Sequence, residues 1–145
     1  MTFHGFVFQI SNAYYPRQVI QIGPNNVTVN SSKNFNGNGQ KWTFWHVYSD
    51  NSYVIRNYPS GRFLGLSYHG ELVGVNEDVA IHWEVQPSGY DPSTWVIRMK
   101  KDTFDRVLTL TEADGAVILD YADSRRGELQ EWRLKDTGMY LDYIA

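Results

Sequence analysis

The sequence contains no cysteine, which excludes a disulfide framework and thiol chemistry. The chain also lacks a large excess of either charge, because the formal net charge is −3 and no run of Lys or Arg forms a basic stripe. The electrostatic footprint expected of a nucleic-acid binder is therefore missing. Apolar runs are short, and none is long enough to cross a bilayer.

Signals for export, catalysis and metal binding are missing too. The first residues show neither the basic start nor the apolar stretch of a signal peptide, so we expect a cytoplasmic protein, with leaderless secretion as the alternative. The four His residues do not have metal-ligand spacing, and no Gly-x-Ser-x-Gly elbow occurs. Gly37-Asn38-Gly39 lacks the Gly-Lys-Ser/Thr ending of a phosphate loop. We expect no enzyme activity, no metal and no cofactor.

The residues that are abundant favour strands and turns. Aromatic residues make up 15% of the chain and hydrophobic residues 42%, and Gly and Asn are frequent. Aromatic and β-branched side chains suit strands, whereas Gly and Asn suit turns. Because no window shows convincing helical periodicity, the composition predicts an all-β domain.

An internal repeat organises these strands. Gln40-Lys41-Trp42 returns as Gln130-Glu131-Trp132, and a decayed copy stands between them at Ile81-His82-Trp83. Each Trp opens a short alternating strand, and the copies are spaced by about forty to fifty residues. A repeat of this period indicates three units that bury their apolar faces together.

Four short strands are predicted in each unit, and their apolar positions match between units. We expect these sets to point inward: Phe6, Tyr53 and Trp95; Phe8, Ile55 and Ile97; Ile20, Leu64 and Leu108; Ile22, Leu66 and Leu110; and Trp42, Trp83 and Trp132. Twelve short strands in three units of four predict a single β-trefoil domain. The units span about 3–46, 47–87 and 88–135, and we expect the apolar tail 136–145 to pack on the barrel or to form a homodimer.

The predicted loops are rich in Asn, Asp, Gln, Tyr and Trp. Amide and carboxylate groups offer paired donors and acceptors to sugar hydroxyls, and an aromatic face covers the apolar face of a sugar ring. This chemistry favours a neutral carbohydrate as the ligand.

The repeated Gln-x-Trp resembles the ricin B-type β-trefoil lectins, especially the cysteine-free mushroom members. Further resemblance lies in Tyr53–Asn57, Ser60–Gly65, Trp83–Pro87 and Trp95–Arg98, and in total it covers about residues 3–135. It implies a lectin that binds glycans or glycoproteins without catalysis, in defence or recognition.

In that family a pocket combines an Asp on the second strand, an aromatic residue after the third, an Asn and the Gln of Gln-x-Trp. The resemblance assigns to the first pocket Gln21 at the Asp position, Phe35 as the aromatic residue, Asn36 or Asn38 as the amide, and Gln40.

The other two units depart further from the family's pattern. The third has Thr109 at the Asp position, followed by Asp120, Tyr121 and an intact Gln130. The second has lost the pattern, and Tyr68, His69, Asn76 and Asp78 are candidates for a different pocket there. We therefore expect pockets that bind sugar in the first and third units.

Three alternatives stay open. Each Gln is as well explained by a bond to loop backbone as by a bond to sugar. Trp45 breaks the alternation and is a candidate for an exposed side chain, as are Tyr14, Tyr15, Tyr68 and Tyr90. The chain also fits a β-trefoil protease inhibitor that uses the loop Tyr14–Arg17, with Arg17 at its tip, or the loop Ser88–Ser93; a structural trefoil or a toxin subunit is the remaining possibility.

Overall fold

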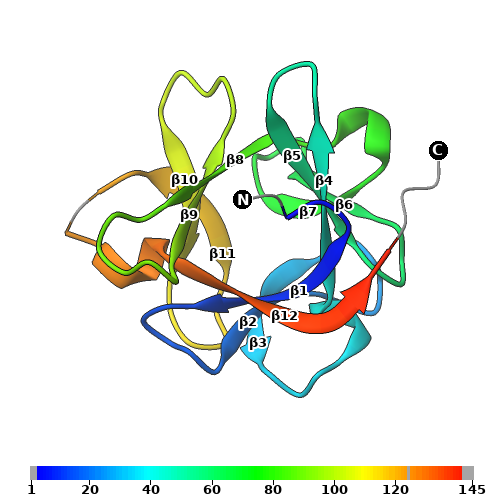
Figure 1. Ribbon diagram of the computed structural model, residues 1–145, viewed down its shortest axis with the longest axis horizontal. Coiled ribbons are helices and arrows are strands. Elements are labelled where there is room, and N and C mark those ends of the chain that lie inside the picture. Colours follow the sequence, from blue (N-terminus) through cyan, green and yellow to red (C-terminus); the bar gives the residue numbers. More distant parts are fainter. Residues whose placement is uncertain (1–2, 124, 142–145) are drawn as a thin grey trace.

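The computed structural model describes residues 3–123 and 125–141, which form twelve strands and three short 3-10 helices (Figure 1). The strands are β1 (Phe6–Asn12), β2 (Gln18–Ile22), β3 (Val29–Lys33), β4 (Trp42–Val47), β5 (Ser52–Asn57), β6 (Phe63–Leu66), β7 (Leu72–Val75), β8 (Trp83–Pro87), β9 (Trp95–Met99), β10 (Arg106–Leu110), β11 (Val117–Tyr121) and β12 (Trp132–Tyr140). The helices are η1 (Asn38–Gln40), η2 (Glu77–Val79) and η3 (Gly127–Gln130). No helix in these described ranges is long and apolar enough to span a membrane.

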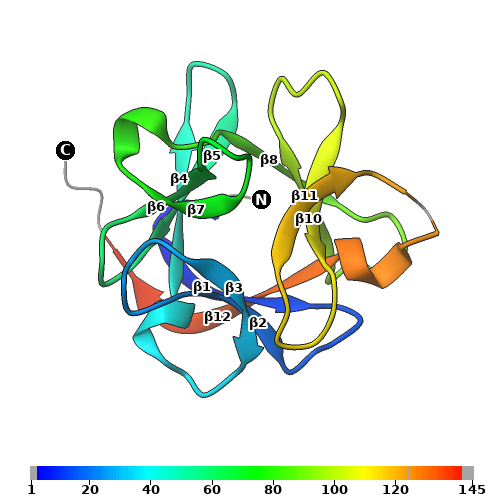
Figure 2. The same ribbon diagram turned by 180° about the vertical axis from the view of Figure 1, so that it is seen from behind.

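Six of the strands close into a barrel. Around it, β1 pairs with β4, β4 with β5, β5 with β8, β8 with β9, β9 with β12, and β12 again with β1. The other six strands form the hairpins β2–β3, β6–β7 and β10–β11, one in each repeat. Figures 1 and 2 show the three resulting lobes from opposite sides. The predicted β-trefoil is confirmed.

The core follows the predicted threefold pattern except in the first strand. Trp42, Trp83 and Trp132 are completely buried, as the repeat predicted. Their barrel partners are Phe8, Tyr53 and Trp95, in that order.

The predicted alignment of Phe6 with Tyr53 and Trp95 is therefore wrong by two residues, and the true match is Phe8. Phe6 is 36% exposed and packs on Tyr140, with ring centroids 5.0 Å apart. The error has a physical cause: positions 6, 8 and 10 are all apolar, so a period of two fits either register. A register irregularity between Phe6 and Phe8, opposite β12, adds to the ambiguity.

The last strand extends beyond the predicted repeat boundary at residue 135. β12 continues to Tyr140, and its register on β1 pairs Asp136 with Phe8 and Tyr140 with Phe6. Leu141 then packs on a small cluster of Trp45, Val54 and Phe63. The tail up to residue 141 thus packs on the barrel of its own chain, residues 142–145 lie outside the described part, and the homodimer stays a prediction.

Trp45 was a candidate for an exposed side chain, and this prediction is wrong. Only 9% of the side chain is exposed, because residues of the second repeat and Leu141 cover the outer face of the barrel there. Tyr14, Tyr68 and Tyr90 are exposed as predicted, whereas Tyr15 packs partly against the core.

Candidate functional site

Gln40 is completely buried and all its described hydrogen bonds are made within the first repeat. Its Oε1 accepts from the backbone N–H groups of Phe35 (3.2 Å) and Gly37 (3.3 Å). Its Nε2 donates to the carbonyl of Lys33 (3.0 Å) and to Oε1 of Gln21 (3.0 Å). Gln40 therefore supports the loop between β3 and β4 and stands behind Gln21 rather than at the surface.

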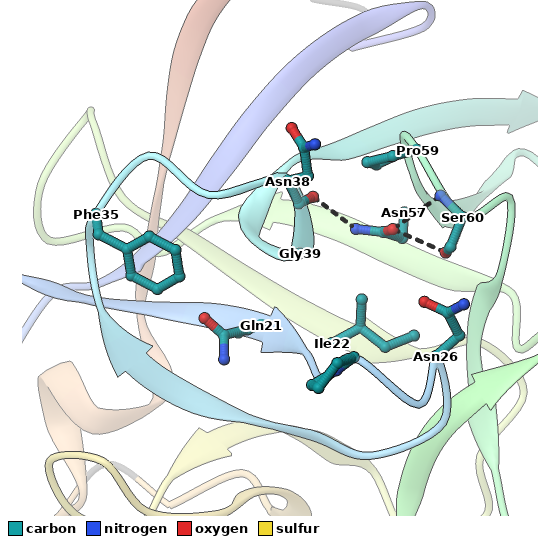
Figure 3. Close-up of a pocket in the computed structure, with 11 residues that line it drawn as sticks. Gln21, Ile22, Asn26, Phe35, Asn38, Gly39, Asn57, Pro59 and Ser60 are labelled. Atoms are coloured by element: carbon teal, nitrogen blue, oxygen red, sulfur yellow. Dashed lines mark hydrogen bonds between the residues drawn. The ribbon is translucent and has the colours of Figure 1, made fainter.

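This network determines which end of Gln21 remains available. Two backbone donors and one backbone acceptor fix the orientation of the Gln40 amide, so the atom of Gln21 that accepts from Gln40 must be its oxygen. The Nε2 of Gln21 is left without a hydrogen bond among the described residues. In Figure 3 the Gln21 side chain extends toward the Phe35 end of the cavity, with its oxygen on the side of Phe35 and its nitrogen pointing away from the ring. The first repeat thus places a fixed amide with a free N–H donor and an aromatic ring at the same end of one site.

A cavity of about 450 Å³ opens in front of this pair (Figure 3). It is lined by Gln21, Ile22, Gly23, Pro24, Asn26, Phe35, Asn38, Gly39, Asn57, Pro59 and Ser60. None of these residues is charged, so a ligand here meets neutral amides, a hydroxyl, and apolar carbon. The lining suits an uncharged polyol and offers no cation to hold an anionic group.

The structure brings three of the predicted residues to the cavity. Gln21, Phe35 and Asn38 line it, Gln40 lies behind Gln21, and Asn36 is an exposed residue in the left-handed conformation (φ 58°) that does not line it. In Figure 3 the Asn38 amide lies at the edge of the cavity and points away from Gln21.

Phe35 is held in place although 67% of it is exposed. A Cβ added to Gly37 would lie 2.1 Å from the Phe35 ring, so only glycine lets the ring lie on the loop backbone. A Cβ on Gly39 would lie 2.4 Å from the carbonyl oxygen of Ile22, on the floor of the cavity. Both glycines therefore serve close approach.

Sequence reasoning missed the side of the cavity built by the second repeat. Asn57 ends β5, and Pro59 and Ser60 lie in the turn that follows; all three reach the cavity because β4 and β5 form a hairpin. Asn57 Nδ2 donates to the carbonyls of Asn38 (3.2 Å) and Lys41 (3.1 Å). Asn57 thus joins the two repeats. The repeat pattern assigns a pocket to one unit and carries no signal for a neighbour's turn.

Gln130 repeats the arrangement of Gln40 in the third repeat, with a different outcome. Its Oε1 accepts from Asp123 N (2.9 Å), and its Nε2 donates to Tyr121 O (2.8 Å) and Thr109 Oγ1 (3.1 Å). The Thr109 hydroxyl donates in turn to the carbonyl of Val107 (3.1 Å) and is completely buried. This position therefore offers no free polar group to a ligand.

Asp120 and Tyr121 do not join Gln130 in a pocket. The Asp120 carboxylate pairs with Arg126 (2.9 Å) and accepts from Tyr121 N (2.8 Å). The Tyr121 side chain lies on the other face of β11, where its ring is 6.3 Å from that of Phe104. The predicted third pocket stays a prediction, and the geometry gives it little support.

The second repeat has closed the corresponding position with apolar side chains. Gly65 stands where Gln21 stands in the first repeat, and a Cβ there would meet Val75 at 2.4 Å. Ile81 replaces the Gln, and its N–H donates to the carbonyl of Leu64 (3.1 Å).

The four candidates for a second-repeat pocket lie at the two ends of one hairpin. Tyr68 and His69 are at its tip, beyond the pair Leu66 and Leu72. Asn76 follows β7 at the base and accepts from Arg62 (2.6 Å), and Asp78 lies in η2. The hairpin thus separates Tyr68 and His69 from Asn76 and Asp78, so the four do not line one pocket.

One cluster contains the residue types of a hydrolytic triad in an unsuitable arrangement. Asp50 lies between Ser52, whose Oγ donates to it (2.5 Å), and His82 Nδ1 (2.8 Å). The hydrogen bond from Ser52, followed by that from His82, lowers the pKa of Asp50 to about 2. A nucleophilic Ser needs the His as its own partner, whereas this Ser donates to the Asp. Within residues 3–123 and 125–141, no three His, Asp or Glu residues are placed to hold a metal ion.

The two loops considered for protease inhibition are both braced from within. Asn12 Oδ1 accepts from Tyr14 N and Tyr15 N (3.0 Å each), and Ser11 Oγ donates to Pro16 O (2.7 Å). In the other loop Asp91 accepts from Ser93 N (2.9 Å), and bonds to Ser93 and to Arg133 lower the pKa of Asp91. A braced loop suits a protease inhibitor, but ordinary tight turns are braced in the same way. Protease inhibition therefore stays a prediction.

Comparisons with known proteins extend the fold assignment. No protein-family model matches the chain, and no curated protein matches its sequence. The solved structure of the Macrolepiota procera ricin B-like lectin in complex with lactose is similar, with a TM-score of 0.80 and 19% identity, over 94% of this chain and 99% of that one. The Rhizoctonia solani agglutinin has a TM-score of 0.75 and 16% identity, over 94% and 98%.

A designed threefold symmetric protein, ThreeFoil, is also similar, with a TM-score of 0.73 and 18% identity, over 90% of this chain and 98% of that one. Identities this low establish the fold rather than the ligand. The chain is a β-trefoil similar in structure to the ricin B-like lectins.

Proposed function

We propose that this protein is a carbohydrate-binding protein that holds a neutral sugar in the cavity of the first repeat, without catalysis. The observation that carries the proposal is the Gln21 amide, whose Oε1 is held by Gln40 and whose Nε2 has no hydrogen-bond partner among the described residues, at the end of the cavity that Phe35 also lines. An aromatic face covers the C–H face of a sugar ring while a fixed amide bonds one of its oxygens.

The charge of the cavity supports the same ligand class. All lining residues are uncharged, so a sugar carboxylate or sulfate would lose its hydration without gaining a cation. Similar folds add to this support, because the Macrolepiota procera lectin was solved with lactose. A single exposed site of this kind binds weakly, and avidity would require several copies.

The experiment is a glycan array with the wild-type protein, Phe35→Ala and Tyr121→Ala. Phe35 and Tyr121 are matched, since 67% and 59% of the two side chains are exposed and removing either one should leave the fold intact. We expect neutral glycans to bind, Phe35→Ala to lose the binding, and Tyr121→Ala to retain it.

Two outcomes contradict the proposal in different ways. If the wild-type protein binds no glycan at high concentration, the function is wrong. If Tyr121→Ala loses binding and Phe35→Ala does not, the protein binds sugar in the third repeat instead.

A further inference from the structure

The cavity continues beyond the end that contains Phe35 and Gln21. Figure 3 shows Phe35 and Gln21 at one end and Asn26 with Ser60 at the other, with Ile22 between them. A volume of about 450 Å³ lies in the range of sites that enclose ligands of roughly 300–1,000 Å³, which is more room than one sugar ring needs. The far end is therefore space for a further part of the ligand.

Asn26 is the residue at the far end that can bind a ligand. It lies in the left-handed conformation (φ 59°) in a turn that Asn25 braces, because Asn25 Oδ1 accepts from Val27 N (2.9 Å) and Thr28 N (3.0 Å). The backbone N–H of Asn26 donates to Gly23 O (2.9 Å), and its carbonyl accepts from Arg62 Nε (3.4 Å). Its side-chain amide makes no hydrogen bond within the described part of the chain.

The neighbouring polar residues at this end are already engaged. Asn57 Oδ1 accepts from Ser60 N (3.2 Å) and Ser60 Oγ (2.7 Å), and Asn57 Nδ2 donates to two carbonyls. The Ser60 hydroxyl also accepts from Arg62 N (3.2 Å). Asn57 and Ser60 therefore form a rigid wall, whereas the Asn26 amide, which points toward them in Figure 3, lines the cavity with its hydrogen-bonding groups unused among the described residues.

We propose that the cavity is a two-residue site for a neutral oligosaccharide. One sugar residue lies against Phe35 and Gln21, and the next lies between the Asn26 amide and the apolar surface of Pro59. This inference rests on the proposed function and adds to it the ligand's length and the part played by the second repeat. The two repeats are joined through Asn57, so the span between the two ends is fixed before binding.

The test compares three monosaccharides (galactose, mannose and N-acetylglucosamine) with the disaccharides lactose, mannobiose and chitobiose by calorimetry. The variants are Asn26→Gly, which removes the amide and tolerates the positive φ, and the control Asn51→Gly. Asn51 has a nearly equal φ of 54° and does not line the cavity. We expect a disaccharide to bind about tenfold more tightly than its monosaccharide, which is the effect of one further good hydrogen bond with packing.

Asn26→Gly should remove most of that tenfold difference, since the contact with Pro59 remains, and leave monosaccharide affinity unchanged, while Asn51→Gly should change neither. Equal affinity of the wild-type protein for disaccharides and monosaccharides would overturn the two-residue site and leave the proposed function intact. So would an Asn26→Gly variant that weakens both kinds of sugar equally. If the wild-type protein binds none of the six sugars, the proposed function and this inference both fail.

Discussion

The first and second repeats follow the same four-strand path but differ at the residue two positions before the Trp. In the first repeat this residue is Gln40, and the indole N–H of Trp42 donates to the carbonyl of Ile20 (2.9 Å). In the second repeat it is Ile81, whose backbone N–H donates to the carbonyl of Leu64, the residue that corresponds to Ile20. The buried Trp83 Nε1 is then left without a hydrogen-bond partner among the described residues.

The difference separates the requirements of the fold from those of the site. The second repeat keeps its Trp in the core, closes the position of Gln21 with Gly65 and Val75, and still folds like the others. A repeat therefore needs the Trp but not the Gln. An open cavity needs the Gln together with a second-strand residue that has a free polar group, and only the first repeat combines the two among the described residues.

The largest effect is expected from removing either Gln. Gln40→Ala and Gln130→Ala each leave several buried backbone groups without partners, so each should lower the free energy of unfolding by about 3 kcal/mol. Urea denaturation measures this loss. Only Gln40→Ala should also lose glycan binding, because Gln130 supports a loop without a free polar group. If Gln130→Ala is as stable as the wild-type protein, the structural role of Gln in the comparison is wrong.

The next effect comes from the indole N–H groups. Trp42→Phe removes a buried hydrogen bond and leaves the Ile20 carbonyl unpaired, whereas Trp83→Phe removes an N–H that is already unpaired. Both variants lose a similar amount of apolar contact. We therefore expect Trp42→Phe to be less stable than Trp83→Phe by about 1–2 kcal/mol in urea denaturation. Equal losses would show that Trp83 has a partner in solution.

A smaller effect concerns the carboxylate beside the second repeat's Trp strand. The hydrogen bonds from Ser52 and His82 lower the pKa of Asp50 from 3.8 to about 2. A lowered folded-state pKa adds stability above the unfolded value of about 3.9, and this is lost as the pH falls toward 2. Between pH 4 and pH 2 the wild-type protein should lose about 1 kcal/mol more than Asp50→Asn. The other carboxylates are common to both proteins, so parallel stability curves would contradict the prediction.

The smallest change in stability is expected from Gln21→Thr. This substitution gives the first repeat the residue type that the third repeat has at the corresponding position, Thr109. Thr109 already accepts from Gln130 in the same geometry, so Thr at position 21 should accept from Gln40 and change stability by less than about 1 kcal/mol. The free amide would nevertheless be gone, and binding to the glycan array should fall. A variant that binds as well as the wild-type protein would show that the Gln21 donor does not contact the ligand.

The sequence by itself determined the β-trefoil. Three Trp residues at regular spacing, each opening an alternating strand, can be buried together only about a common axis. The local part of the site followed from the resemblance to the ricin B-type lectins, which assigned Gln21, Phe35 and Asn38 to one pocket, and all three line the cavity.

Only the tertiary structure decided the rest. Phe6 and Phe8 both satisfy a period of two, and their order was settled by pairing with Trp42 and Tyr140. Trp45 is buried because distant segments cover it.

The same holds for the function assigned to each residue. Gln40 could have contacted a ligand or the loop, and its four partners inside the fold show that it holds the loop. Asn26 and Ser60 reach the cavity from separate segments. Periodicity reports which face of a strand is buried, but which polar groups remain unpaired depends on all the neighbours that folding brings to them.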